Sequence, residues 1–254
     1  MGPTTSTSAC HPIVDIPPRV AARMAGVLYL IIIVGGIFAE IGVRARLVVQ
    51  GDPAATAHNI AAHELLYRFG FAVQLFYLLC AVPIKVLLYD LFSIVNRPTA
   101  ILMIFFSLLG TAVEAATLLL HYVPLVLLGK AAYLNPFTPE QLQGASYLSL
   151  RLFETGFSIA LAFFGPFCIL LGSLILRCTF FPRVVGGLLV IQGSLYLINS
   201  FANFISPAVG ARVFPFLAIS GLGEVSFCLC LLVLGVNAQR WSAQAGLNVG
   251  GIGS

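Results

Sequence analysis

Six long apolar runs constrain this chain more than any other feature of its sequence. Each run exceeds the about 20 residues that an α-helix needs to cross a hydrocarbon core of about 30 Å. With 59% hydrophobic and only 9% charged residues, the chain has too little polar surface for a soluble globule. Long unbroken runs also lack the alternation of barrel strands, so we expect an all-α polytopic membrane helix bundle. The six predicted transmembrane helices are residues 21–43, 69–92, 98–129, 145–177, 184–205 and 213–236.

The segments outside these runs predict one transmembrane domain between two tails. The first segment is rich in Ser, Thr and Pro, which favours disorder, and the last is expected to be flexible. Between the first two spans, Asp52 can cap a helix that has a proline at its first position, so a short helix is expected in the outer loop. The predicted parts are a disordered tail over 1–20, the domain over 21–237, its outer loop over 44–68, and a flexible tail over 238–254.

Basic residues at the ends of the runs predict the orientation in the membrane. Arg19 and Arg23 precede the first run, and further arginines lie in the short loops on the same side. Because positive charges in short loops favour the cytoplasmic side, we expect both termini to be cytoplasmic.

Each predicted span carries a stripe of polar residues at steps of three, four and seven, which places them on one helical face. Such stripes cannot face lipid, and intramembrane glutamates indicate function by default. We expect most of the stripes to converge in the outer half of the bundle, whereas Lys85, near the inner end of its span, is expected to reach the interface. The predicted ligand-binding residues are Glu40, Glu114, His121, Arg151, Glu154, Asn199, Asn203 and Glu224.

Two pairs within that set have alternative interpretations. Arg151 and Glu154 are three residues apart and can form an ion pair that only fixes helix packing. His121 lies seven residues after Glu114 on the same face and could relay a proton, or bind a metal together with Glu154. The spacings of known zinc sites are absent from the sequence, so we predict no metal and no cofactor.

Several segments together resemble a known family. These are Ala22–Gly26, Phe38–Glu40, the GDPAATAHNI segment, Val95–Arg97, Phe164–Gly165, Phe181–Arg183 and Gly223–Ser226. They are similar to a bacterial family of six-helix integral membrane proteins that is catalogued as a domain of unknown function, over roughly Ala21 to Val236. The resemblance implies the cytoplasmic membrane of a bacterium and brings no established activity with it.

The polar stripes favour a protein that binds or transports a small or amphiphilic ligand in a polar pocket. The first alternative is a membrane enzyme acting on lipid or isoprenoid, with Glu114 or Glu154 as acid and base and His121 as proton partner. The second is a structural or sensory protein in which the polar network only specifies helix packing. The expected partners are the lipid bilayer and a small-molecule or lipid ligand. Nucleic acid is not expected, because the chain has no basic block. The oligomeric state is left open.

Overall fold

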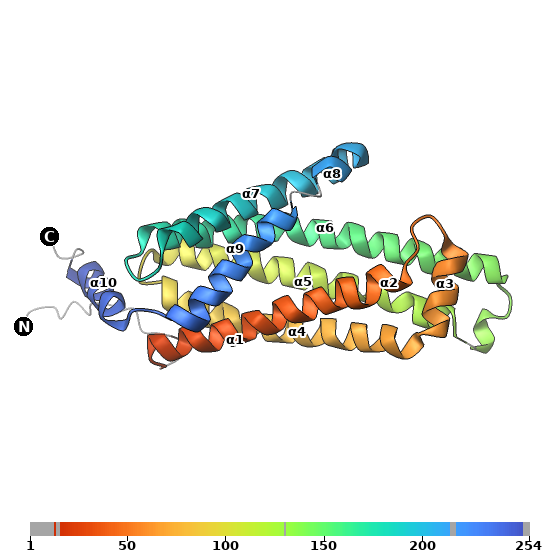
Figure 1. Cartoon of the computed structure of the whole chain (residues 1–254), viewed down its shortest axis with the longest axis horizontal. Helices are drawn as coiled ribbons and strands as arrows, with labels where there is room; N and C mark the ends of the chain where they lie inside the picture. Colours follow the sequence, from red (N-terminus) through yellow and green to blue (C-terminus); the bar gives the residue numbers. More distant parts are fainter. Residues whose placement is uncertain (1–12, 14–15, 130, 214–216, 251–254) are drawn as a thin grey trace, which may run out of the picture.

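The structure is a computed structural model that describes residues 13, 16–129, 131–213 and 217–250. All regular secondary structure in these ranges is helical, and Figure 1 shows the longest helices running along one axis. The helices are α1 Pro18–Ile37, the π-helix η1 Phe38–Arg44, α2 Ala45–Leu47, α3 Pro53–Ala62, α4 Glu64–Phe92, α5 Arg97–Leu127, the short 3₁₀ helix η2 Ala132–Leu134, α6 Pro139–Arg177, α7 Arg183–Ile205, α8 Pro207–Val213, α9 Leu217–Leu229, the π-helix η4 Cys230–Leu234, and α10 Ala238–Gly250.

Five helical segments of the described residues are long and apolar enough to cross a membrane, and the number is six if a bent pair near the C-terminal end of the chain counts as one span. The five are α1 continued through α2, then α4, α5, α6 and α7. The sixth consists of α9 with η4, followed by a bend of 100° into α10. Gly235 lies at this bend with φ +59°, a backbone conformation that a residue without a Cβ adopts at little cost. The protein is therefore a multi-pass membrane protein.

The spans are arranged as a ring in chain order. Each span packs against the next one in the sequence, and α9 with η4 closes the ring against α1. At one end the ring is filled by an apolar cluster in which the rings of Phe92, Phe181 and Phe227 contact one another. Towards the other end, Phe153, Leu118 and neighbouring apolar side chains pack together. The middle of the ring lies between these two packed regions.

The end of the molecule that holds the start of α1 also holds α10 (Figure 1). The Trp241 indole of α10 donates to the carbonyl of Leu91 at 3.1 Å, and Gln244 accepts from the Thr179 amide at 3.0 Å. The helix thus lies across the ends of α4 and α6. We refer to this as the α10 end. The sequence predicted a flexible tail from residue 238; here the structure differs, because long-range contacts hold the segment as a helix.

The spans differ greatly in length. α6 has 39 residues and α7 has 23, which correspond to about 58 Å and about 34 Å of helix. Their register is set by close glycine contacts, Gly172 against Gly186 and Gly165 against Gly193. The same register places the last residue of α7, Ile205, level with Phe153. The first part of α6 therefore extends past α7, and Figure 1 shows it beside α3 and the end of α5.

Candidate functional site: a central cavity

A cavity of about 370 Å³ occupies the middle of the ring. Side chains from α1, α4, α5, α6, α7 and α9 line it, so every span contributes to its wall. Most of the lining is apolar, with Ile33, Leu78 and Phe164 as examples. The polar lining residues are few and come from different helices: Tyr29, Tyr77, Lys85, Ser107, Thr111, Glu114, Tyr196 and Glu224. An apolar pocket with a few convergent polar groups is typical of small-molecule sites.

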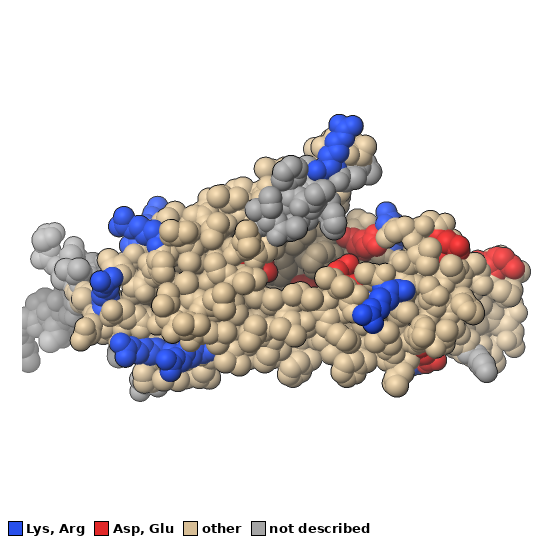
Figure 2. All heavy atoms as spheres, in the orientation of Figure 1, with Lys and Arg blue, Asp and Glu red and all other residues tan. Residues whose placement is uncertain are grey.

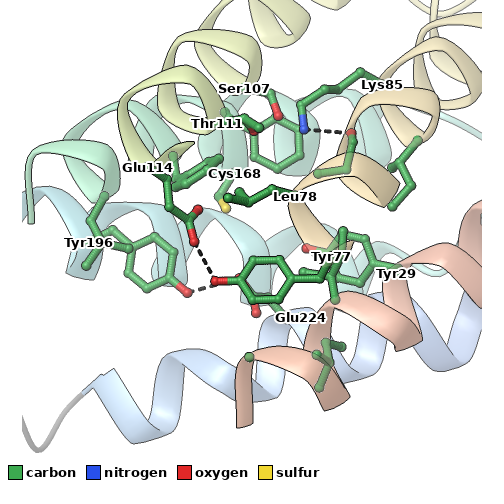
Figure 3. A pocket seen from close by; sticks show the side chains of 18 of the residues that line it. Tyr29, Tyr77, Leu78, Lys85, Ser107, Thr111, Glu114, Cys168, Tyr196 and Glu224 are labelled. Atoms are coloured by element: carbon green, nitrogen blue, oxygen red, sulfur yellow. Dashed lines mark hydrogen bonds between the residues drawn. The ribbon is translucent and has the colours of Figure 1, made fainter. Parts of the chain in front are cut away.

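Glu114 is the carboxylate that α5 directs into the cavity. It is 5% exposed, and its Oε1 accepts a hydrogen bond of 2.6 Å from the Tyr77 hydroxyl on α4 (Figure 3). Ser107 and Thr111 precede it on the same face of α5 at steps of three and four, and both also line the cavity. The polar face of α5 therefore points into the ring and away from lipid.

Glu224 brings a second carboxylate to the cavity from α9. Its Oε1 accepts hydrogen bonds from the Gln192 amide at 2.8 Å and the Tyr196 hydroxyl at 3.0 Å. The Gln192 amide also donates to the Tyr196 hydroxyl at 3.1 Å. Gly223 lets α9 approach this group, because a Cβ at that position would lie 2.3 Å from Gln192 Oε1. Both cavity carboxylates are thus held by neutral donors, and each has a tyrosine partner.

Lys85 is the basic residue of the cavity lining. Its side chain is buried, at 6% exposure, and its Nζ donates to the Ala81 carbonyl one turn earlier in α4 at 2.7 Å. Figure 3 shows the amine beside Ser107 and Thr111. The expectation that this side chain reaches the interface is wrong, because it is buried among the spans. The amine lies beside the polar face of α5 inside the ring, which the sequence of α4 alone does not reveal.

The cavity opens sideways, between α1 and α9. Gly36 and Ile37 of α1 lie on one side of this opening, and Gly221 and Val225 of α9 lie on the other. A Cβ added at Gly36 or at Gly221 would meet no atom within 4 Å, so both glycines border open space. Figure 2 shows a hollow on this face of the molecule with acidic atoms inside it and at its rim. We call this opening the lateral mouth.

Of the eight residues predicted as ligand-binding, Glu114 and Glu224 line the cavity. Three others lie level with the far end of α7, outside the cavity lining: Glu40 pairs with Arg44, and Glu154 pairs with Arg151. Arg44 also lies over the Phe153 ring, 4.7 Å from its centroid. These ion pairs are partly exposed and lie in the region where α7 ends.

The remaining three predicted residues have packing environments of their own. His121 is 4% exposed and stacks on Tyr67 with ring centroids 4.7 Å apart. Asn199 is buried in α7, and Asn203 lies where α7 meets α8, against Gly210. In the described part of the chain, no group of three or more His, Cys, Asp or Glu is placed to hold a metal ion.

A match to a known protein family identifies the family of this chain. A family model described as a domain of unknown function, DUF4386, matches residues 24–235. The chain belongs to the DUF4386 family. No curated protein and no solved structure matches it. The matched segment begins within α1 and ends at the glycine that follows η4, so the DUF4386 domain is the ring of helices around the cavity.

The sequence contained a signal for the cavity residues of this DUF4386 domain that were not selected as site residues. Tyr29, Tyr77, Lys85 and Tyr196 all lie on the polar stripes of their spans, together with the two glutamates. The prediction gave charged residues more weight than tyrosines, so it included Glu40, Arg151 and Glu154 and left the tyrosines out. The cavity residues differ from the other residues of the polar stripes in their depth along the axis of the ring, not in their charge.

Proposed function

We propose that this protein binds a small amphiphilic ligand in the central cavity, and that binding serves its transport or its presentation within the membrane. The observation that carries the proposal is the cavity itself: its wall is mostly apolar, and two carboxylates and one amine face into it. An apolar wall suits a hydrocarbon chain, and a few fixed polar groups suit a head group. We further propose that the α10 end is cytoplasmic and that the membrane is the inner membrane of a bacterium.

The packing on either side of the cavity favours binding over free conduction. Towards the α10 end, the aromatic cluster around Phe92 and Phe227 fills the ring. Towards the other end, Phe153 is fully buried and His121 packs on it with centroids 5.1 Å apart. A continuous aqueous pore is inconsistent with both packed regions. A ligand therefore reaches the cavity through the lateral mouth, and any transport needs a further rearrangement.

Blocking the cavity tests this proposal. Gly36→Phe and Gly221→Phe each add a ring where the structure has open space, so the fold is expected to tolerate them while the cavity is filled. We measure the unfolding temperature of the purified protein in phosphatidylcholine nanodiscs as dodecylamine, dodecanol or dodecanoate is added. The wild-type protein is expected to be stabilised by at least one of these amphiphiles, because a ligand that binds only the folded state raises its stability.

Gly187→Phe is the matched control. A Cβ at Gly187 also meets nothing within 4 Å, and this residue of α7 is not part of the cavity lining. It should respond to the amphiphile as the wild-type protein does, whereas the two cavity variants should show no ligand-induced rise. Equal stabilisation in all four proteins, or in none of them, would exclude the cavity as the binding site for these probes.

A further inference from the structure

We infer that the ligand is an amphiphile with a protonated amine head, which enters the cavity from the bilayer through the lateral mouth. This inference rests on the proposed function and adds the chemical class of the ligand. It follows from the charges that face the cavity, from the groups that hold them, and from the character of the lateral mouth.

The fixed charges of the cavity are unequal in number. Glu114 and Glu224 contribute two carboxylates, and Lys85 contributes one amine. Arg44–Glu40, Arg68–Glu64 and Arg151–Glu154 are ion pairs, and none of these three involves a cavity residue. An ionised group away from water is costly unless it is paired. A ligand that brings one positive charge makes the balance two and two, whereas an anionic ligand increases the excess of negative charge.

The carboxylates are also positioned for a cation. Tyr77 holds Glu114, and Gln192 with Tyr196 holds Glu224. These partners are neutral donors, so they fix the two carboxyl groups in place without forming an ion pair with either of them. Aromatic rings line the same space, among them Tyr29 and Phe157. Tyrosine and phenylalanine faces attract ammonium groups, particularly where water is excluded.

Lys85 does not take the place of the ligand amine. Its Nζ donates to the Ala81 carbonyl on its own helix, on the side of Ser107 and Thr111. This leaves the space beside the two carboxylates for a second positive group. A head with a negative charge would instead be drawn to Lys85, so this residue distinguishes the two kinds of ligand.

The lateral mouth is suited to a hydrocarbon chain. Its side chains are apolar, and Ile37 and Val225 are 54% and 43% exposed. In a bilayer these exposed surfaces contact acyl chains. An amphiphile dissolved in the membrane can thus place its chain in the mouth while its head reaches the carboxylates.

The test compares three probes with the same C12 chain and different heads: dodecylamine, dodecanol and dodecanoate. Binding to the protein in phosphatidylcholine nanodiscs is measured by native mass spectrometry and by the unfolding temperature. We expect dodecylamine to bind about tenfold or more tightly than dodecanol, as for a hydrogen bond to a charged group. Dodecanoate should bind weakest.

Changes at three cavity residues test whether the preference for dodecylamine arises in the cavity. Glu114→Gln and Glu224→Gln, singly and together, should reduce dodecylamine affinity towards that of dodecanol, because each removes a charge and retains the shape. Lys85→Met should raise dodecylamine affinity by removing a competing positive charge. Glu64→Gln, which alters an exposed ion pair outside the cavity, is the control for non-specific attraction of the amine.

The possible results separate this inference from the proposed function. If dodecanol or dodecanoate binds best, or if the two Glu→Gln changes leave the amine preference intact, the inference of an amine ligand is overturned. The proposed function still stands in that case, provided that Gly36→Phe abolishes binding of the preferred probe. If Lys85→Met abolishes binding of dodecanoate as the preferred probe, the ligand class is anionic. If no probe binds in a manner sensitive to Gly36→Phe, the proposed function fails together with the inference.

Discussion

At the scale of single residues, glutamates with the same side chain have very different surroundings. Glu114 is 5% exposed and accepts a hydrogen bond from Tyr77 of the neighbouring span α4. The side chains of Glu154 and Arg151 are 34% and 53% exposed, and they pair with each other on one helix. The ion pair is easily recognised in the sequence, but it lies near the end of α7 and outside the cavity lining. The cavity instead receives glutamates that have no cation nearby in the sequence.

Glu154→Gln should therefore have little effect. Exposed ion pairs contribute about 0–1 kcal/mol, so we expect the free energy of unfolding to change by less than about 1 kcal/mol. Stabilisation by an amphiphile should be retained. Chemical denaturation in detergent, repeated with the best of the C12 probes, measures both quantities. A loss of probe binding as large as that of Glu114→Gln would show that Glu154 also belongs to the binding site.

At the scale of helices, the backbones of α6 and α7 are in close contact with each other. A Cβ at Gly193 would lie 2.4 Å from the Gly165 carbonyl, and a Cβ at Gly172 would lie 2.6 Å from the Gly186 carbonyl. Small residues at such positions allow helix backbones to approach in a membrane, where the hydrophobic effect does not drive helices together. This contact fixes the register that brings Tyr196 level with the cavity.

Gly193→Ala should disrupt that contact. The added methyl group has no space against backbone, and overpacking of this kind costs about 1–3 kcal/mol. Gly187→Ala on the same helix is the matched change, because its Cβ meets nothing within 4 Å and alanine is the better helix former. Thermal unfolding of the two variants should give a lower midpoint for Gly193→Ala alone. Equal midpoints would contradict the close contact.

At the scale of the whole molecule, the α10 end and the α3 end differ in charge. Figure 2 shows basic residues in both halves of the molecule; Arg19, Arg23 and Arg183 lie near helix starts at the α10 end. Acidic residues are visible towards the other end in the same view. This distribution is consistent with the proposed orientation, in which the α10 end faces the cytoplasm.

Cysteine labelling tests the orientation. Asn135→Cys and Ser242→Cys place a thiol at an exposed position at the α3 end and on α10, respectively. The variants are made in a Cys10→Ser, Cys230→Ser background, because Cys230 is only partly buried, whereas Cys80, Cys168, Cys178 and Cys228 are buried. A membrane-impermeant maleimide should label Asn135→Cys in intact spheroplasts and Ser242→Cys only after lysis. The reverse pattern would invert the proposed topology.

The sequence predicted the class of fold because apolar runs of spanning length leave few alternatives. It also predicted the inward faces, since the helical period of Ser107, Thr111 and Glu114 alone determines which side of α5 is polar. The depth of each polar residue along the axis of the ring could not be predicted. This depth depends on the register between neighbouring helices and on the extra length of α6. The α10 contact from Trp241 to Leu91 joins residues 150 positions apart and has no local signal.

The ring closes between the first span and the last, and this has a consequence for synthesis. The chain enters the membrane from its N-terminus, so five spans are in place before α9 brings Glu224 to the wall. During that interval the inward face of α5, with Glu114, borders an incomplete enclosure. An amphiphile already resting there would give the final helix a surface to close on. Under the proposed function, such a ligand would therefore also assist the assembly of the ring.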